Sequence, residues 1–498
     1  MKTFTLATTA LFTLFAGCAV QPNALSEVEI VNLAENNRAN VTAKQEPVTQ
    51  SIDLYEAMAR ALKYNLDHRV EVLNAALAID NLKVSSFDLL PRAVVNSGYT
   101  GRNNFSGGIS QSLLTGQQSL EPSTSSERQV GNADVALSWN VLDFGLSYIR
   151  AKQGANEALI AEERRRRVIQ EVVRDVRAAY WRAVSAERLH SRLSGLKGRV
   201  SRALSNSRKL EHSGATSPVT ALTYQRELLD IQRQIEDLYQ ELKVAKAELA
   251  RLMNLRPTDH FNLVVPKRTN RHIKLNVSYD DMVTVALENR PELRELAYRG
   301  RINKLEGKAG LVELLPGIEV FTGANFDSND LLFNNNFLQA GARTSWNLIQ
   351  VFSLPAKKRA NKTRGEIIKT QALAMTMAVM AQINIGRVRF HHLHRKYHTA
   401  GEYLNVQRKI LRQVQVAASR DAASEQSLIR EEMNTLVASV RYDIVNADMQ
   451  NTYGEIFAAM GVDTQGANLT GNESVSQLKQ LLRDDWLANG LRPAPKVN

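Results

Sequence analysis

The chain has 498 residues, of which 23% are charged and 6% are aromatic, and its formal net charge is +12. Few aromatic residues, together with sparse glycine and proline, favour long helices over a β-sandwich or a doubly wound sheet. The basic residues are dispersed along predicted helices and are expected to pair with acids, as Arg233 with Glu227, and the sequence has no zinc-finger spacing or RNA-binding aromatic motif. These features argue against nucleic acid as a partner.

The N-terminus has the pattern of an export signal. Lys2 precedes an apolar run over residues 4–16, which is too short to span a bilayer as a helix. The run leads into the sequence LFAGC at 14–18, which resembles a bacterial lipobox, so we expect Cys18 to be acylated, for example with palmitate, and to become the mature N-terminus. Ala19 stands in place of the aspartate that marks inner-membrane retention, so the resemblance implies the outer membrane. Cys18 is the only cysteine, which excludes an internal disulfide.

Two blocks of sequence occur twice. Residues 61–91 align without a gap with residues 286–316, and both blocks end in Leu-Leu-Pro. Farther on, the Trp-Asn pair at 139–140 matches the pair at 346–347 at a different offset. All the length variation therefore lies in one connection within each half, as expected of an exposed loop. We infer that the chain holds two structural units.

The two units share one pattern of helix and strand. Residues 55–88 have the apolar spacing of a helix, and the pattern stops at Pro91. An alternation of apolar and polar residues follows at 133–141 and again at 338–348, which predicts strands with one apolar face. The remaining predicted elements are partner strands at 93–100 and 317–325 and polar loops at 103–131 and 326–336.

Strands of about ten residues with one apolar face suit a transmembrane β-barrel. Four such strands cannot close a barrel alone, because the smallest barrels need about eight. Several chains must therefore pool their strands, so this prediction makes an oligomer obligatory.

A long helix is expected after each exit strand. Helical spacing runs from about residue 147 to 212, breaks at the sequence SGATSP (213–218) and resumes to about 255. The second unit has its turn near 420–425. At 1.5 Å per residue, one long helix equals two short helices end to end, so the chain is expected to run up, through a hairpin, down to a tip and back. Pro355 is expected to mark the corner between strand and helix.

The other charged stretches have ordinary explanations. Arg164 to Arg167 follow two glutamates on the first long helix and predict an ion-paired surface. His391, His394 and His398 share one helical face, but the basic residues beside them disfavour a cation, so no metal site is expected. No nucleophile elbow or metalloprotease motif occurs in the sequence, and we expect neither catalytic residues nor an enzyme.

In this order and spacing, the segments resemble the TolC-like outer-membrane efflux and secretion channel family over about residues 50–465. The resemblance rests on the doubled Leu-Leu-Pro segment, the two Trp-Asn exit strands and the SGATSPV turn at 213–219. It implies a mainly α-helical homotrimer with a transmembrane β-barrel. The twelve-stranded barrel would take four strands from each protomer and continue into a long α-helical tunnel in the periplasm.

The resemblance also implies partners. The family is a passive duct without a cofactor, anchored here to outer-membrane lipid. Energy comes from an inner-membrane pump of the resistance-nodulation-division or ABC type, and a periplasmic membrane-fusion adaptor docks on the helical tips. The positions that match the docking turns are Gly214, Ala215, Thr216, Ser217, Pro218 and Val219 in the first unit and Asp421, Ala422, Ala423 and Ser424 in the second.

The second turn departs from the family pattern, because Asp421 stands where glycine is usual. In the family, carboxylates just after this turn can ring the closed periplasmic aperture. The directly matching positions are Ser427 and Arg430. The candidates for the aperture are Glu425, Ser427, Arg430 and Glu431. The alternative is a solvated helix start, where the helix dipole favours acids.

The predicted organisation follows the repeat. It comprises a lipoprotein signal peptide at 1–17, a lipidated N-terminal linker at 18–50, a first efflux repeat at 51–255, an equatorial linker at 256–278, a second repeat at 279–462 and a C-terminal equatorial tail at 463–498.

Two functions remain open at this stage. The favoured one is passive exit across the outer membrane, for drug efflux or for type I protein secretion. The alternative is a periplasmic adaptor or coiled-coil scaffold lipoprotein of an export complex. An adaptor has one helical hairpin flanked by small β domains, whereas this chain has two equal units with two one-sided hairpins, and this difference favours the channel.

Overall fold

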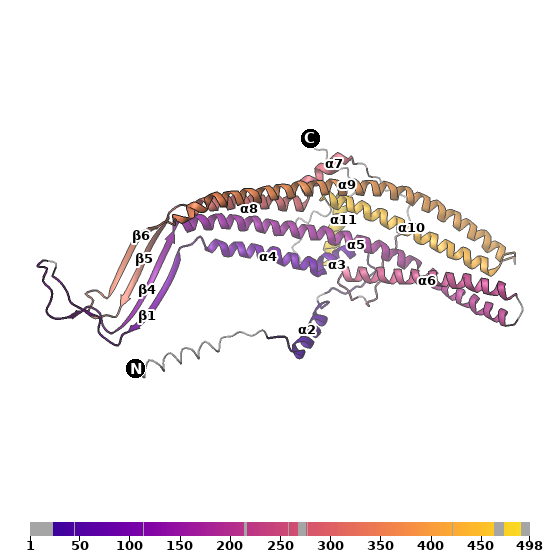
Figure 1. The fold of residues 1–498 in the computed structure, drawn as a ribbon. Coiled ribbons are helices and arrows are strands. Elements are labelled where there is room, and N and C mark those ends of the chain that lie inside the picture. Colours follow the sequence, from indigo (N-terminus) through magenta and orange to yellow (C-terminus); the bar gives the residue numbers. More distant parts are fainter. Residues whose placement is uncertain are drawn as a thin grey trace.

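In a computed structural model of the chain, two very long helices run most of the length of an elongated rod (Figure 1). A four-stranded sheet lies at one end of the rod, and helical turns lie at the other. The structure describes residues 23–43, 45–112, 114–213, 217–256, 258–266, 275, 277–420, 422–462 and 473–489.

The same succession of elements occurs twice along the chain. The first series is α3 (Leu54–Tyr64), α4 (Leu66–Phe87), β1 (Arg92–Gly101), β4 (Gln129–Asn140), α5 (Val141–His212) and α6 (Pro218–Leu252). The second series is α7 (Tyr279–Asn289), α8 (Pro291–Val312), β5 (Gly317–Asp327), β6 (Asn336–Ser345), α9 (Ile349–Ala418) and α10 (Glu425–Ala459). The other elements are α2 (Glu27–Asn40), the short strands β2 (Gly107–Gly108) and β3 (Ser123–Thr124), and α11 (Val475–Asn489).

The sheet joins the two series. Its order is β1-β4-β5-β6 and every neighbouring pair is antiparallel. The central pair brings together strands from different series, with Val135 opposite Ala324. Within the described part of the chain, β1 and β6 are edge strands that pair on one side only.

The helices continue the order of the strands. Helix α4 packs on α5, α5 on α8 and α8 on α9, which gives a four-helix layer next to the sheet (Figure 1). Beyond the middle of the rod, α6 pairs with α5 and α10 pairs with α9, while α10 also lies against α5. No helix in the described part of the chain has the length and hydropathy needed to cross a bilayer.

Apolar cores hold the middle and the far half of the rod. One core gathers α3, α5, α6 and α11 around the fully buried Ile52, Met58 and Met253. A second core surrounds Met282 and Phe390 between α7, α9 and α10. A third core joins α5, α6 and α10. The four-helix layer beside the sheet contributes little to these cores, so its packing depends on smaller contacts.

The helix predicted at 55–88 is two helices in the structure. Asn65 ends α3 with an extended ψ of 126°, and its side chain accepts a hydrogen bond from the His68 backbone N–H at 3.0 Å to cap α4. Arg290 has nearly the same conformation between α7 and α8, with Pro291 at the first helical position. Proline disfavours a helical residue before it, so the break in the second series was readable from the sequence.

The boundary between strand and long helix also differs from the prediction. Strand β4 ends at Asn140, whose side chain accepts from the Leu142 N–H at 2.9 Å, so α5 begins about six residues earlier than expected. Strand β6 ends at Ser345 and α9 begins at Ile349. Pro355 therefore lies inside α9 and does not mark the corner.

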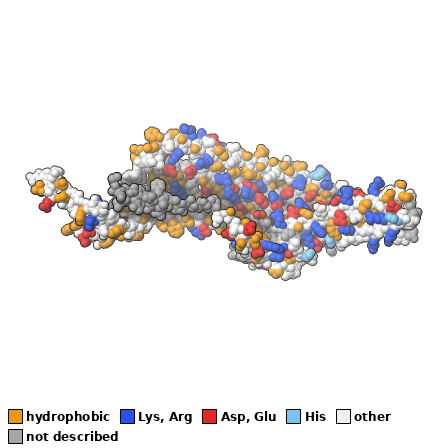
Figure 2. All heavy atoms as spheres, turned by 60° about the horizontal axis from the view of Figure 1, so that its bottom comes forward, with side chains coloured by type: hydrophobic (Ala, Val, Ile, Leu, Met, Phe, Trp, Pro, Cys, Tyr) orange, Lys and Arg blue, Asp and Glu red, His pale blue; other side chains and the backbone are white. Residues whose placement is uncertain are grey.

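Charged residues of both signs are interspersed over the helical part of the molecule (Figure 2). The ion-paired surface predicted at Arg164 to Arg167 is confirmed, since each of these arginines has a carboxylate within 4 Å. The pairing expected between Glu227 and Arg233 is wrong. Arg233 pairs with Asp230 at 2.8 Å, one helical turn away, whereas Glu227 faces another helix.

Candidate functional site

The four-stranded sheet exposes its apolar face and partly covers its polar face, which is the reverse of a sheet in a water-soluble protein. Side chains of the apolar face on the central strands are exposed, with Val135 at 52%, Trp139 at 44% and Val320 at 51% exposure. The polar residues that alternate with them, such as Asp134 and Glu319, are half-buried. The apolar face comprises Val95, Val135, Leu137, Trp139, Ile318, Val320, Phe326 and Leu338, and the polar face Arg92, Asn96, Asp134, Ser138, Asn140, Glu319, Asn325, Asp327, Gln339 and Arg343.

An apolar face of this size exposed to water is costly, because each Å² of apolar surface removed from water stabilises by about 25 cal/mol. Large exposed apolar patches mark surfaces that meet a membrane or another protein. The polar face is internally bonded: Arg343 donates to Glu319 at 2.7 Å, and Asn96 donates to Asp134 at 2.9 Å. The arrangement suits a wall between lipid on one side and water on the other.

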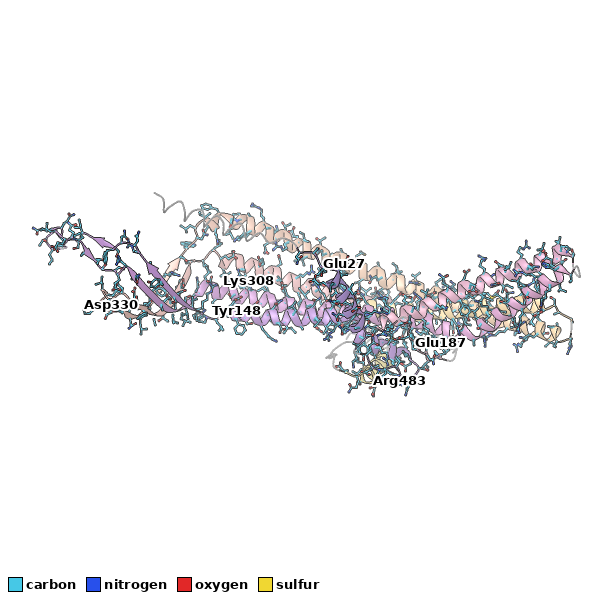
Figure 3. The ribbon with its side chains drawn as sticks, turned by 90° about the horizontal axis from the view of Figure 1, so that it is seen from below. Glu27, Tyr148, Glu187, Lys308, Asp330 and Arg483 are labelled. Atoms are coloured by element: carbon cyan, nitrogen blue, oxygen red, sulfur yellow. The ribbon has the colours of Figure 1, made fainter. Side chains whose placement is uncertain are left out.

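The loop between β5 and β6 anchors the longer loop between β1 and β4. Asn329 is buried; its side chain accepts from the Glu127 N–H at 3.0 Å and donates to the Ser125 carbonyl at 2.9 Å. Ser328 exchanges hydrogen bonds with the backbone of Gly131. The neighbouring Asp330 marks this loop at the sheet end of the rod in Figure 3. The anchors fix the base of the long loop, whereas its outer part forms the small β2–β3 hairpin.

The first helical tip lies between α5 and α6. Ser217 precedes α6 without a side-chain cap bond, and Pro218 occupies its first turn, where its missing N–H costs nothing. Ser217, Pro218 and Val219 are all exposed. Gln225 donates to Glu211 at 2.6 Å and ties the two helices together just above the turn.

The second tip lies between α9 and α10. The Ala422 N–H donates to the Ala417 carbonyl at 2.9 Å, and Ser424 caps α10 by accepting from the Ser427 N–H at 3.2 Å. The hydroxyls of Ser424 and Ser427 lie 3.0 Å apart. Ala422 and Ser424 are exposed, and Ala423 is partly buried.

The candidate aperture residues all lie in the first two turns of α10, but they point to different neighbours. Ser427 serves the cap, and Glu425 is exposed beside it. Arg430 approaches Glu227 of α6 at 3.7 Å. Glu431 accepts from the buried Gln407 of α9 at 2.5 Å. The structure therefore does not gather these four side chains into one cluster within a single chain.

Sequence reasoning missed the contacts that tie the two pairs of helices together. Glu432 of α10 forms an ion pair with Arg199 of α5, and Gln426 donates to Glu227 of α6 at 2.7 Å. Farther from the tips, the buried Asp443 of α10 accepts a hydrogen bond from Arg188 of α5 at 2.7 Å. These partners lie about two hundred or more residues apart in the chain, so no local pattern could have identified them. We name the Arg199–Glu432 and Glu227–Gln426–Arg430 contacts the cross-coil ties.

Some of the predicted site residues lie outside the residues that the structure describes. They are Cys18, Gly214, Ala215, Thr216 and Asp421. Among the residues that are described, no cluster of three or more potential ligands could hold a metal ion. The rings of His394 and His398 lie 5.3 Å apart, edge to face, on α9.

Several solved outer-membrane channels have the same fold as this chain. The CmeC channel of Campylobacter jejuni matches with a TM-score of 0.66 and 13% identity over 94% of this chain and 98% of that chain. The channel OprN matches with a TM-score of 0.62 and 14% identity over 85% and 95%. VceC of Vibrio cholerae matches with a TM-score of 0.61 and 12% identity over 82% and 96%.

The sequence itself matches a family model over part of its length. Residues 104–255 match the model described as outer membrane efflux protein. Among curated proteins, none matches the sequence significantly.

Proposed function

We propose that the chain is the outer-membrane duct of an export system, because residues 104–255 match the outer membrane efflux protein model and the chain shares the fold of outer-membrane channels over most of its length. In this proposal three copies pool their sheets into one twelve-stranded barrel. The four-helix layers continue the barrel as a tunnel through the periplasm.

The reversed polarity of the sheet carries the proposal. A barrel in lipid needs an apolar band outside and a polar lining inside. The exposed Val135, Leu137 and Trp139 would meet lipid, whereas Asp134 and Glu319 would line the water-filled interior. A sheet placed in lipid also has to be closed, because unpaired backbone groups there are very costly. Pairing of β6 with β1 of the next copy would satisfy both edges.

The helical layer supports pooling of the same kind. Its edge helices expose large apolar side chains away from the rest of the chain, including Leu73 and Leu77 of α4 and Leu373 and Met377 of α9. Packing α9 of one copy against α4 of the next would bury both rows. A single threefold arrangement would therefore cover the open edges of both the sheet and the helical layer.

Adjacent substitutions on opposite faces of β4 test the proposal. Leu137→Arg places a charge in the apolar band, which we expect to cost about 2–4 kcal/mol of membrane stability near the bilayer midplane. Ala136→Arg adds the same charge to the polar face and serves as the matched control. Heat-resistant trimers in outer-membrane extracts are expected for Ala136→Arg and strongly reduced for Leu137→Arg. Equal yields of trimer from the two variants would overturn the proposal.

The alternative is an adaptor or scaffold lipoprotein of an export complex. It predicts a periplasmic protein without conductance. Purified protein reconstituted in a planar bilayer distinguishes the two, because only the duct gives discrete single-channel steps. The doubled series of elements and the four-strand sheet favour the duct.

We further propose that Cys18 is acylated and anchors the N-terminal linker to the outer membrane. The proposal rests on the LFAGC sequence alone. Metabolic labelling with an alkyne fatty acid should mark the protein, and Cys18→Ser should remove the label. We expect trimers to persist in Cys18→Ser, because the barrel supplies its own membrane contact. Labelling of the serine variant would contradict the anchor.

The helical tips are proposed to receive a periplasmic adaptor, which links the duct to an inner-membrane pump. Ser217, Pro218 and Val219 are exposed at the first tip, and Ala422 and Ser424 at the second. Val219→Asp is expected to reduce co-purification with the adaptor of the host's export system while trimers remain. The cargo is either small drugs or protein, and both fit this proposal.

A further inference from the structure

Charged residues within the four long strands are unevenly distributed along the sheet. The strands contain five, and all five lie on the polar face. Near the helices are Arg92, Glu319 and Arg343, which we name the inner collar. Farther out are Asp134 and Asp327, which we name the outer ring. The apolar face has no charge to balance either group.

The inner collar is a connected group with a net positive charge. Arg343 donates to Glu319 at 2.7 Å, and the charge of Arg92 on β1 also acts on this carboxylate. The collar holds two guanidinium groups and one carboxylate, so one positive charge per chain is left over. Phe321 lies beside the collar on the same face, over Gly341, where a Cβ would come within 2.7 Å of the ring.

The outer part of the polar face has the opposite sign. The Asp134 carboxylate accepts from the neutral Asn96 side chain at 2.9 Å, and the Asp327 carboxylate accepts from the Asn329 backbone N–H at 2.9 Å. Arg92 lies opposite Ser138, and Asp134 is four residues farther along the same strand, β4. Asp327 lies opposite Asn132, two residues beyond Asp134. At about 3.3 Å per residue the separation is roughly 13–20 Å. This exceeds the Debye length of about 10 Å in 0.1 M salt, so the two groups act as separate fields.

We propose that the sheet forms a bipolar pore in which the basic inner collar and the acidic outer ring make ion flow depend on direction. The inference rests on the proposed function, since it requires that the polar face line the channel. Anions gather at the collar and cations gather at the outer ring. A voltage that is positive on the loop side drives anions outward through the collar and cations inward through the ring, which fills the pore with both ions. The opposite voltage drains both.

The predicted signature is a rectified current. In about 0.1 M KCl the conductance with the loop side positive should exceed the conductance with the loop side negative. In about 1 M KCl, where the Debye length falls to roughly 3 Å, the ratio should approach one. Leu114 is exposed in the long loop between β1 and β4. In a biotinylated Leu114→Cys variant, streptavidin added to one side of the bilayer binds only when the loop faces that side, which identifies the orientation of each channel.

Single substitutions move the ratio in opposite directions. Arg343→Gln and Asp134→Asn each weaken one ring and should lower the ratio. Glu319→Gln strengthens the collar and should raise it above that of the unaltered protein. The control Arg38→Gln makes the same charge change on α2, which stands apart from the helical layer (Figure 1).

The outcomes separate the two proposals. Protein that forms no channels contradicts the duct itself. Channels with equal conductance at both polarities, or a Glu319→Gln variant that shifts the ratio in the same direction as Arg343→Gln, overturn the bipolar pore and leave the duct intact. Heat-resistant trimers are checked for every variant, so that loss of rectification is not confused with misassembly.

Discussion

At the residue scale, a carboxylate holds the two halves of the helical layer together. Glu295 of α8 is buried and accepts hydrogen bonds from Arg164 of α5 at 3.0 Å and from Arg299 at 2.6 Å. Burial alone would raise the pKa of Glu295, but the two arginines outweigh it, and the pKa lies below its usual value. The carboxylate is therefore more stable ionised in the folded chain than in the unfolded chain.

We predict that Glu295→Gln destabilises the helical layer by about 1 kcal/mol at pH 7, a modest figure because Arg164 is half-exposed. The contribution is present above the unfolded pKa of about 4.3 and is lost as pH falls through the lower folded value. Thermal melting of the helices, followed by circular dichroism, should thus separate the variant from the unaltered protein at pH 7, and the difference should shrink as the pH falls below about 4. Glu171→Gln, whose partner Arg167 is 3.9 Å away, is the control. A difference between the Glu295 variant and the unaltered protein that does not shrink as the pH is lowered would rule out this linkage.

The sequence predicted local ion pairs but not distant ones. Arg165 and Arg166 pair with glutamates three residues earlier, as helical spacing requires. Arg164 instead reaches Glu295, 131 residues away. Such a partner depends on which helices become neighbours, and no local spacing encodes it. The same reason explains why the cross-coil ties escaped prediction.

At the element scale, α6 and α10 end in matching turns. After α6, Asn254 has a positive φ of 57°, and the Leu255 N–H donates to the Ala250 carbonyl at 2.8 Å. After α10, Gly461 has a φ of 71°. These are left-handed caps of the kind that closes many helices. A Cβ at Gly461 would also lie 2.8 Å from the backbone of Asn289.

Gly461→Ala is expected to cost about 1–3 kcal/mol, since it combines backbone strain with a backbone clash. Asn254→Gly should cost far less, because glycine adopts the same conformation freely. Chemical denaturation of both variants, monitored by helix content, makes the comparison. Equal stability of Gly461→Ala and the unaltered protein would refute the steric argument.

The cross-coil ties connect the two helical pairs near the tips. Glu227→Ala removes contacts to both Gln426 and Arg430, and these contacts hold the start of α10 against α6. We expect this variant to increase the open probability of the reconstituted channel, because the start of α10 is then freer to move. Glu236→Ala, which loses only the exposed contact to Lys197, should leave gating unchanged. If both variants behave like the unaltered protein, the ties do not restrain the aperture.

Element boundaries were the least predictable part of the fold. The strands and the long helices were found from their periods. The break between α3 and α4 was missed because no proline marks it; the Asn65 side chain caps α4 there instead. The corner after β6 was misplaced because the alternation continues through Trp346 and Leu348. In the structure, Trp346 leaves the strand and donates to the Leu314 carbonyl at 2.9 Å.

At the scale of the whole molecule, neither series of elements is a separate domain. Strand β4 pairs with β5, and α5 packs on both α8 and α10, so the contacts that complete each half come from the other half. The sequence showed that a unit occurs twice. It could not show that the units interlock, since a doubled sequence is equally compatible with two separate domains.

We predict that a chain cut within the linker at 256–278 assembles only when both pieces are present. Co-expressed pieces should copurify and give heat-resistant trimers, whereas either piece alone should be degraded, because its share of the sheet and of α5 packing is missing. Removal of residues 107–124, which form the tip of the outer loop beyond the Asn329 anchors, is the control and should leave trimers intact. A first piece that folds stably by itself would contradict the interlocked arrangement.

The exposed apolar face of the sheet constrains how a newly made chain can mature. Before insertion into a membrane, the apolar face and the unpaired edges of β1 and β6 would promote aggregation with other newly made copies in water. The helices, with their own buried cores, can form early. In the proposed trimer, the strands would pair last, at the lipid surface and together with the strands of two other copies, and a chaperone would have to shield them before that.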